Sequence, residues 1–282
     1  MTAFLDKIVA ATRRRVSEAK GSVDLSELER RAEEHVPRGF RRALESSQVS
    51  QNRRDLGHPR ERIAVIAELK KASPSKGLIR ESFNVVELAR ELEAAGATAL
   101  SVLTDEEFFQ GSLGNLREAS AAVAVPCLRK DFIVDEFQLM EARANSADAV
   151  LLIVAALTQA ELTALTKGAA DYELDVLCEV HDAEELQRAV DAGCKLIGVN
   201  TRDLRTFKVD LETAFRLGEK FPADVVRVAE SGIRSGEDVA RLRAAGYDAF
   251  LIGESLMRAE RPGEVLRELL LVPGEHRLPS RT

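Results

Sequence analysis

The chain has 282 residues, of which 45% are hydrophobic and 31% charged, and its formal net charge is −7. This size suits one large α/β domain or two small ones, and the acidic balance argues against a nucleic-acid partner, which usually requires a basic surface. No stretch approaches the roughly 18 apolar residues that span a membrane, and the three cysteines form no C-x-x-C pair. We therefore expect a soluble, cytoplasmic protein in a reducing compartment, with no disulfide framework and no membrane partner.

The first 60 residues form a predicted helical extension that packs on the rest of the chain. A second helix is expected over about 25–34, and the polar segment 47–62 is typical of a loop. The first helix carries an apolar stripe at helical spacing, which favours packing over a mobile arm. The residues of this stripe are Leu5, Ile8, Val9, Thr12 and Val16.

From about residue 63 onward, the chain repeats a short apolar run, a polar or glycine turn and a segment of helical period. The predicted strands lie near 63–69, 98–103, 125–129, 148–154, 174–179, 195–199, 225–229 and 248–252. The predicted helices lie near 84–95, 115–123, 135–145, 158–169, 182–192, 210–219, 235–245 and 262–270. Several of them end at a glycine, such as Gly96, Gly193 and Gly246, as is usual before the next strand.

Strands and helices that alternate with no hairpin signal between them predict a parallel sheet, and eight strands are enough to close a barrel. We predict an α/β fold, a (β/α)8 TIM barrel over residues 61–272, with the extension 1–60 before it and a tail over 273–282 after it. An open doubly wound sheet is the alternative, but it usually has fewer strands and a glycine-rich first turn. Here the first turn has the sequence Ser-Pro-Ser-Lys-Gly over 73–77.

The last two strand–helix units indicate the kind of ligand. Residues 228–233 and 249–256 each contain an apolar run that stops at a glycine beside small polar residues. Gly232 and Gly253 would let backbone N–H groups approach an anion at the start of a helix. The last two loops of a (β/α)8 barrel are also its usual phosphate site. The sequence therefore predicts a phosphorylated small molecule as the ligand.

Charged residues stand at the carboxyl ends of three predicted strands, where such barrels carry their catalytic groups. Glu68 and Lys70 are two residues apart and so share a face, although a structural salt bridge is the alternative. Lys130 is a candidate general acid, because desolvation would lower its pKa, and a surface lysine is the alternative. Glu179 ends a strongly apolar run, and burial would raise its pKa for acid–base chemistry.

Polar residues also follow the sixth predicted strand. Asn200 and Arg202 share a face and could bind a carboxylate or hydroxyls, although a surface pair of Arg202 with Asp203 is the alternative. His181 follows Glu179 closely, and we interpret it as a helix cap or a surface residue. The four histidines are scattered through the chain, so no metal site is expected.

Seven segments, taken in order, resemble the indole-3-glycerol-phosphate synthase family and cover nearly the whole barrel. They are AELKKASPSKG at 67–77, LSVLTDEEFFQGS at 100–112, LRKDFI at 128–133, EVH at 179–181, NTRDL at 200–204, AESGI at 229–233 and FLIGESLM at 250–257. The segment PRGF at 37–40 is also similar to that family. Other phosphate-binding barrels of the tryptophan and histidine pathways share only the last two segments.

The resemblance implies a carboxy-lyase of tryptophan biosynthesis. Such an enzyme closes 1-(2-carboxyphenylamino)-1-deoxyribulose 5-phosphate to indole-3-glycerol phosphate, with loss of CO2 and then water. In this sequence Lys130 matches the general acid for ring closure, and Glu179 matches the carboxylate for later proton transfer and dehydration. Glu68 and Lys70 match residues that position the substrate and share the acid–base work. No cofactor or metal is implied.

The resemblance also implies a binding set around these groups. Asn200 and Arg202 would orient the substrate carboxylate or hydroxyls, and Phe109 and Phe132 would hold the anthranilate ring. Thr201 and Cys178 depart from the family's usual residues without disturbing a named role. The remaining substrate contacts are Ser73, Glu230, Ser231 and Leu251, and the phosphate contacts are Gly232, Gly253 and Glu254.

Two other functions are compatible with a phosphate-binding barrel. One is a different enzyme, such as a sugar-phosphate isomerase, and the other is a catalytically silent barrel that binds a phosphometabolite or a protein. The intact set of charged residues at the strand ends argues against both. We expect a phosphorylated small molecule as the partner and a monomer in solution, with a weak homodimer as the alternative.

Overall fold

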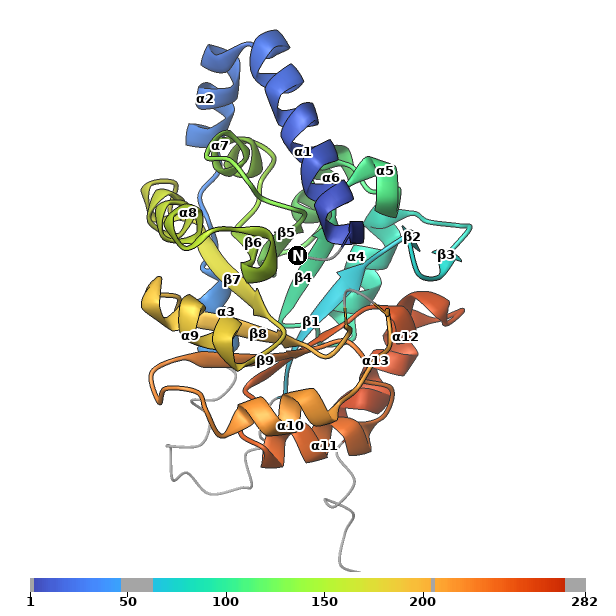
Figure 1. The fold of residues 1–282 in the computed structure, drawn as a ribbon. Coiled ribbons are helices and arrows are strands. Elements are labelled where there is room, and N and C mark those ends of the chain that lie inside the picture. Colours follow the sequence, from blue (N-terminus) through green and yellow to red (C-terminus); the bar gives the residue numbers. More distant parts are fainter. Residues whose placement is uncertain (1–2, 47–62, 204–205, 272–282) are drawn as a thin grey trace, which may run out of the picture.

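The computed structural model describes residues 3–46, 63–203 and 206–271, and eight parallel strands close into a barrel at its centre (Figure 1). Each strand pairs with the next one along the chain, and the last strand pairs with the first. This arrangement confirms the predicted (β/α)8 barrel. The strands are β1 Ala64–Leu69, β4 Ala99–Leu103, β5 Cys127–Lys130, β6 Ala149–Ile153, β7 Asp175–Val180, β8 Leu196–Asn200, β9 Val226–Glu230 and β10 Ala249–Ile252.

Helices on the outside of the barrel return the chain from one strand to the next, as parallel pairing requires. They are α4 Val85–Ala94, α6 Leu113–Ala122, α7 Phe137–Ala144, α8 Gln159–Asp171, α9 Ala183–Asp191, α10 Glu212–Gly218, α11 Gly236–Ala244 and α13 Pro262–Leu270. Their ends lie within two residues of the predicted ranges. Gly96, Gly193 and Gly246 adopt positive φ just beyond helix ends, which confirms their predicted place.

The sequence does not predict several short elements, because a single turn is too short to show a period. Three are the helices α5 Glu106–Phe109, α12 Glu254–Arg258 and the 3-10 turn η2 Val154–Ala156. The others are strands β2 Ala72–Ser73 and β3 Gly77–Leu78, which pair antiparallel inside the loop after β1. A small hairpin therefore stands where we expected only a turn.

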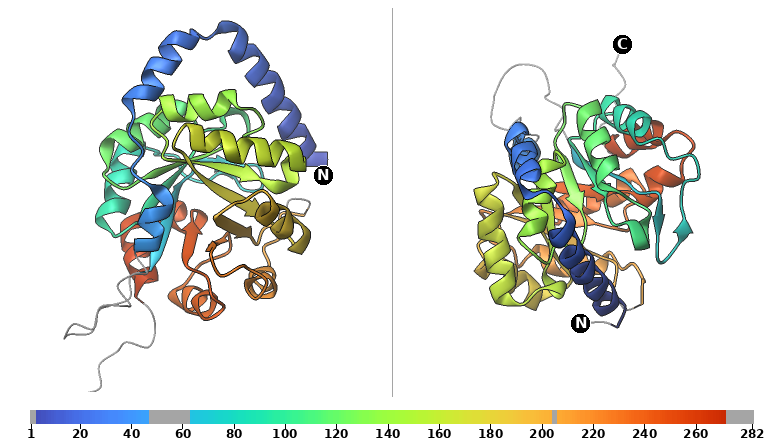
Figure 2. Two further views of the ribbon diagram at one scale, coloured as in Figure 1. Left: turned by 90° about the vertical axis from the view of Figure 1, so that its left-hand side faces the viewer. Right: turned by 90° about the horizontal axis from the view of Figure 1, so that it is seen from above.

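The extension reaches from one end of the barrel to the other (Figure 2). Helix α1 Ala3–Ser22 crosses the end where the strands finish, and α2 Leu25–Glu34 lies beside α7. Helix α3 Phe40–Ser46, which the sequence did not predict, lies at the opposite end, where the backbone N–H of Arg41 donates to Asp175 at the start of β7. The predicted loop 47–62 and tail 273–282 lie outside the described residues, and their boundaries stay predictions.

One hydrophobic core joins the barrel, its outer helices and the extension. Leu5 and Val9 of α1 belong to it, as do Phe40 and Leu44 of α3, which are completely buried. Burial of a side chain of that size stabilises the fold by roughly 1.5–3 kcal/mol. The predicted stripe of α1 is buried as expected, since each of its five members is at most 7% exposed.

Candidate active site

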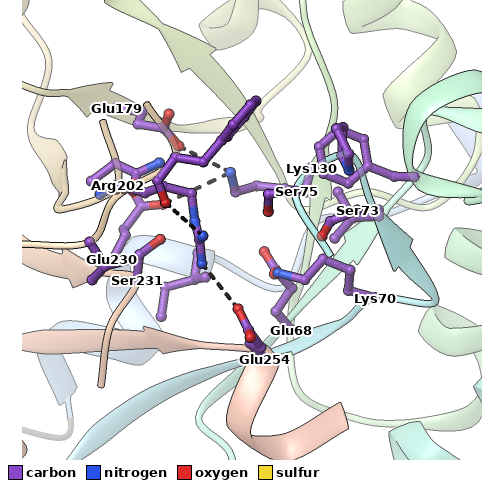
Figure 3. Close-up of a pocket in the computed structure, with 18 of the residues that line it drawn as sticks. Glu68, Lys70, Ser73, Ser75, Lys130, Glu179, Arg202, Glu230, Ser231 and Glu254 are labelled. Carbon is purple, nitrogen blue, oxygen red and sulfur yellow. Dashed lines mark hydrogen bonds and ion pairs between the residues drawn. The ribbon is translucent and has the colours of Figure 1, made fainter. Parts of the chain in front are cut away.

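A cavity of about 500 Å³ opens at the carboxyl ends of the barrel strands. Figure 3 shows charged side chains from several strands converging on this space. All fifteen site residues named from the sequence line it, although they come from segments spread over the whole barrel. They are Glu68, Lys70, Ser73, Phe109, Lys130, Phe132, Glu179, Asn200, Arg202, Glu230, Ser231, Gly232, Leu251, Gly253 and Glu254.

The strand ends bring Lys130, Glu179 and Glu230 together. The Lys130 Nζ atom at the end of β5 lies 3.0 Å from Oε2 of Glu179 in β7 and 3.9 Å from Oε2 of Glu230 in β9. Glu179 and Glu230 are 2% and 1% exposed, so neither carboxylate is solvated. The barrel thus holds one lysine between two buried acids, and charge pairing replaces the lost water.

This pairing overturns our expectations for two pKa values. Burial alone would lower the pKa of Lys130, but the facing carboxylates of Glu179, Glu230 and Glu68 raise it above its ordinary value. Burial would likewise raise the pKa of Glu179, but Lys130, His181 and Asn200 lower it to about 2. Both side chains are therefore charged at neutral pH, because opposite charges within a few ångströms outweigh desolvation.

Glu230 behaves in the opposite way. Burial and the neighbouring Glu179 raise its pKa well above the ordinary value. Its Oε1 atom is buried and makes no hydrogen bond within the described residues. Gly198 makes room for this oxygen, since a Cβ atom there would lie 1.9 Å from it. The site therefore contains one carboxyl group whose oxygen has no partner of its own.

A second charged pair faces this cluster from β1. The Lys70 Nζ atom lies 2.5 Å from Oε1 of Glu68, which is 5% exposed. Gly253 after β10 packs against this pair, because a Cβ atom there would lie 2.5 Å from the same oxygen. Gly253 therefore also leaves space for Glu68, a role that the phosphate argument alone did not suggest.

Basic side chains gather at the end of the cavity near β8 and β10. Glu254 Oε2 accepts from Nη2 of Arg202 at 3.1 Å, and its Oε1 lies 3.2 Å from Nε of Arg258 and 3.9 Å from Nζ of Lys76. Arg202 thus pairs with Glu254 inside the cavity, instead of forming only the surface pair that was the alternative. These cations stand beside the two glycine turns at Gly232 and Gly253, and the site can accept an anion there.

Aromatic rings line the opposite end of the cavity. The rings of Phe109 on α5 and Phe132 after β5 have centroids 6.3 Å apart. Residues of the extension also line the cavity, and sequence reasoning missed them. Leu5 and Ile8 stood in the predicted stripe of α1, but a helical period does not say what the stripe covers. The cavity-lining residues of the extension are Phe4, Leu5 and Ile8.

His181 is neither a helix cap nor a surface residue, and our interpretation of it was wrong. Asp182 caps α9 instead, and the His181 side chain is only 15% exposed. Its ring lies behind Glu179, with Nε2 3.5 Å from Glu179 Oε1 and Nδ1 3.0 Å from Glu185 Oε2. The signal in the sequence was the position of Glu179 two residues before the histidine and Glu185 four residues after it. The turn between β7 and α9 brings both acids against the ring.

Within residues 3–46, 63–203 and 206–271, no three histidine, cysteine or acidic side chains are grouped so that they could hold a metal ion. None of the helices in these ranges is long and apolar enough to cross a membrane. The fold and the cavity define a (β/α)8 barrel of the enzyme class, whose cavity carries basic side chains near β8 and β10, aromatic rings near β5, and paired lysines and acids between them.

Comparison with known proteins narrows this class. The family model described as indole-3-glycerol phosphate synthase matches residues 5–269. A relative of that name from Koribacter versatilis is 58% identical over 271 residues, which cover 96% of this chain and 100% of that protein. Another from Acidithiobacillus ferrooxidans is 49% identical over 270 residues, covering 95% and 99%. The chain belongs to the indole-3-glycerol phosphate synthase family.

Solved structures resemble the fold at low sequence identity. A crystal structure of 3-hexulose-6-phosphate synthase superposes with a TM-score of 0.60 at 16% identity, covering 73% of this chain and 98% of that one. A thiamine phosphate pyrophosphorylase from Pyrococcus furiosus gives a TM-score of 0.54 at 19% identity, covering 73% and 93%. Likeness at this level shows the barrel fold alone.

Proposed function

We propose that the cavity closes 1-(2-carboxyphenylamino)-1-deoxyribulose 5-phosphate to indole-3-glycerol phosphate, and that the five charged residues Glu68, Lys70, Lys130, Glu179 and Glu230 carry this carboxy-lyase reaction. The observation that carries the proposal is the position of Lys130, which lies 3.0 Å from Glu179 and 3.9 Å from Glu230 in the middle of the cavity. A cation held there by buried acids can face the substrate carbonyl that must be protonated.

The order of groups along the cavity matches the order of groups in the substrate. The aromatic ring would lie between Phe109 and Phe132, and the phosphate would lie at the glycine turns near Gly232 and Gly253. The linking carboxylate and hydroxyls would then pass Arg202 and the central charged groups. This placement holds the ring carbon close to the carbonyl that it attacks, and positioning of this kind lowers the activation barrier.

Lys130 acts as the general acid of ring closure. The ring carbon that carries the carboxylate bonds to the carbonyl carbon, and the Lys130 ammonium gives its proton to the carbonyl oxygen, which becomes a hydroxyl. The positive charge that develops on the ring and its nitrogen is stabilised by the neighbouring carboxylates. Loss of CO2 then returns the electron pair of the broken bond to the ring and removes that charge.

Glu179 acts after decarboxylation. As a carboxylate it takes the proton that leaves carbon, while the new hydroxyl departs as water after it has received a proton. Its pKa of about 2 suits a group that must be ionised when the reaction begins. Glu68 and Lys70 position the substrate and share the proton transfers, and Lys70 is the second candidate for the proton that reaches the hydroxyl.

Indole fluorescence tests this assignment when purified protein meets the carboxyphenylamino-deoxyribulose phosphate. We expect wild-type turnover, with kcat about 1,000-fold lower in Lys130→Ala and about 100-fold lower in Glu179→Gln. Lys195→Ala is the matched control, because Lys195 pairs with exposed Asp224 on the surface. It should keep wild-type turnover.

Two other outcomes would contradict the proposal in different ways. Folded wild-type protein that binds the substrate without forming indole would support the catalytically silent barrel. Folded protein that does not bind it would support a barrel for another phosphorylated substrate, such as a sugar-phosphate isomerase. Equal turnover in Lys130→Ala and wild type would remove Lys130 from the mechanism.

The finer expectations on assembly and location belong to the same proposal. We propose a cytoplasmic monomer, with a weak homodimer as the alternative. Among the described residues, the large hydrophobic side chains that are exposed lie on four separate segments, whereas a stable interface needs a continuous patch. Light scattering across a range of concentrations would decide between the two states. The exposed residues are Leu25, Val36, Leu78 and Leu271.

A further inference from the structure

His181 lies between two carboxylates on opposite sides of its ring. Nδ1 is 3.0 Å from Oε2 of Glu185, which also accepts the backbone N–H of His181 at 2.7 Å. Nε2 points the other way and lies 3.5 Å from Oε1 of Glu179. The ring is 15% exposed and Glu185 is 16% exposed, whereas Glu179 is buried. The imidazole thus connects a buried acid of the cavity to an acid near the surface.

The two facing carboxylates favour protons on both ring nitrogens. A neutral imidazole carries one N–H and one lone pair, so one of the two carboxylates would face a lone pair. Nε2 is buried and makes no hydrogen bond within the described residues, and Glu179 Oε1 faces it at 3.5 Å. An imidazolium satisfies both sides at once, because each N–H then meets a negative charge.

The other charge close to the ring belongs to Lys130, which opposes protonation of His181, whereas Glu179 and Glu185 favour it. Lys130 and His181 approach different oxygens of the same carboxylate. Lys130 Nζ takes Oε2 of Glu179 at 3.0 Å, and the histidine faces Oε1. Glu179 therefore has the Lys130 ammonium at one oxygen and the His181 ring at the other.

We propose that His181 is a positioning residue for Glu179, and that its doubly protonated ring, held by Glu185, keeps the carboxylate ionised and turned toward Lys130. The inference rests on the proposed function, because it concerns the group assigned to proton transfer after decarboxylation. His181 does not line the cavity, so it acts through Glu179 and not on the substrate.

The pH behaviour follows from the charges. Burial lowers the pKa of His181, but Glu185 and Glu179 raise it above 6.5 overall. As pH rises through the pKa of His181, the ring loses its positive charge. Glu179 then has no cation on its Oε1 side, and kcat should fall. This basic limb belongs to His181, so it should vanish when the ring is replaced. It should move to lower pH when Glu185 loses its charge.

The first test measures the charge of the ring in the free protein. The chain has four histidines, so the ring Cε1–H signal of His181 can be assigned in NMR spectra as the one missing in His181→Gln. We expect its titration midpoint above 6.5 in the wild type, and lower in both Glu179→Gln and Glu185→Gln than in the wild type. Glu184→Gln, an exposed neighbour on α9, is the control and should leave the midpoint unchanged.

The second test measures kcat and KM for the carboxyphenylamino-deoxyribulose phosphate between about pH 5 and 9. His181→Gln should lower kcat about tenfold at neutral pH, leave KM nearly unchanged and remove the basic limb. Glu185→Gln should keep most of the activity at low pH and shift the limb downward by about one unit. A merely structural role for His181 would lower stability without moving the limb.

The two tests separate this inference from the proposed function. Absence of indole from wild-type protein would sink the function, while the NMR titration would still decide whether His181 is an imidazolium. An ordinary midpoint at or below 6.5, or one that ignores both glutamate variants, would overturn the inference. So would wild-type turnover combined with an unchanged pH profile of kcat in His181→Gln.

Discussion

Two buried carboxyl groups at opposite ends of the barrel differ in how they are satisfied. Asp148, just before β6, is completely buried, and its oxygens accept from the backbone N–H of Arg38 at 2.7 Å and of Cys127 at 2.6 Å. The Arg38 Nε atom adds a bond of 3.0 Å. Glu230, at the end of β9, is 1% exposed, but its Oε1 has no partner in the described residues and Lys130 stands 3.9 Å from Oε2.

The difference separates a carboxylate that the fold holds ionised from a carboxyl group whose ionisation its surroundings oppose. Burial alone would raise the pKa of Asp148, but His35 and Arg38 hold it below its usual value. Burial raises the pKa of Glu230, and nearby acids raise it further. A buried charge with all its bonds made stabilises the fold, whereas one left unsatisfied destabilises the free protein and has bonding capacity left for a ligand. Burial by itself does not tell the two apart.

The largest effect is expected from filling the space that Glu230 uses. In Gly198→Ala the new Cβ atom would lie 1.9 Å from Glu230 Oε1, so the carboxyl group must move toward the cavity. We expect kcat/KM to fall about 1,000-fold with a nearly unchanged thermal midpoint, since a flexible side-chain end gives way. Gly21→Ala on α1 is the control, because nothing lies within 4 Å of its Cβ position. Wild-type activity in Gly198→Ala would contradict the assignment of Glu230 to the site.

The second prediction tests whether Asp148 contributes to the stability of the fold. Asp148→Asn should lower the free energy of unfolding by about 3 kcal/mol, because it leaves the Arg38 guanidinium half-buried without its counter-charge. Turnover per folded molecule should stay at the wild-type value, since the site lies at the other end of the barrel. Urea unfolding and the indole assay measure the two quantities on the same sample. A loss of turnover without a loss of stability would reverse the comparison.

Glu230→Gln should change the free energy of unfolding in the opposite direction and make the protein more stable. The raised pKa means that ionisation costs the folded protein stability once pH rises above the unfolded value, so removing the charge should stabilise it by about 1 kcal/mol at neutral pH. At acid pH, where the wild-type carboxyl is protonated, the gain should disappear.

Asp148 contributes stability that is present above its unfolded pKa and is lost as pH falls through the lower folded value. Unfolding curves of the wild type, Glu230→Gln and Asp148→Asn at several pH values measure how each carboxyl group changes the free energy of unfolding with pH. The same pH dependence for both groups would refute the distinction between Asp148 and Glu230.

The smallest effect is expected where helix α1 of the extension contacts the carboxyl end of the barrel. Arg15 of α1 lies 3.0 Å from Asp105 and 3.6 Å from Asp131, both buried, and Asp105 caps the helix that carries Phe109. Arg15→Met should raise KM about fivefold, which corresponds to roughly 1 kcal/mol of lost binding. Arg13→Met is the matched control on the same helix, because its partner Glu161 is 34% exposed. Equal KM changes in the two variants would mean that the seating of α1 matters and not the Arg15 contact.

Much of the site could be predicted from the sequence because it follows from the strand pattern. Glu179 and Lys130 stand at the ends of apolar runs, and every barrel strand ends at the same mouth, so their convergence followed from the fold. Their pKa values could not be predicted in the same way. The two residues are 49 positions apart, and only their 3.0 Å contact reverses the effect of burial.

The sequence by itself determined the fold, the bounds of the barrel strands and of the helices between them to within two residues, and the strand ends that carry charge. It did so because hydrophobic period and glycine turns are local properties of the chain. The tertiary structure alone decided which charges meet, which oxygen stays unpaired, and that Phe4 and Ile8 of the extension wall the cavity. These features depend on distances in space between remote segments, and no local pattern records such distances.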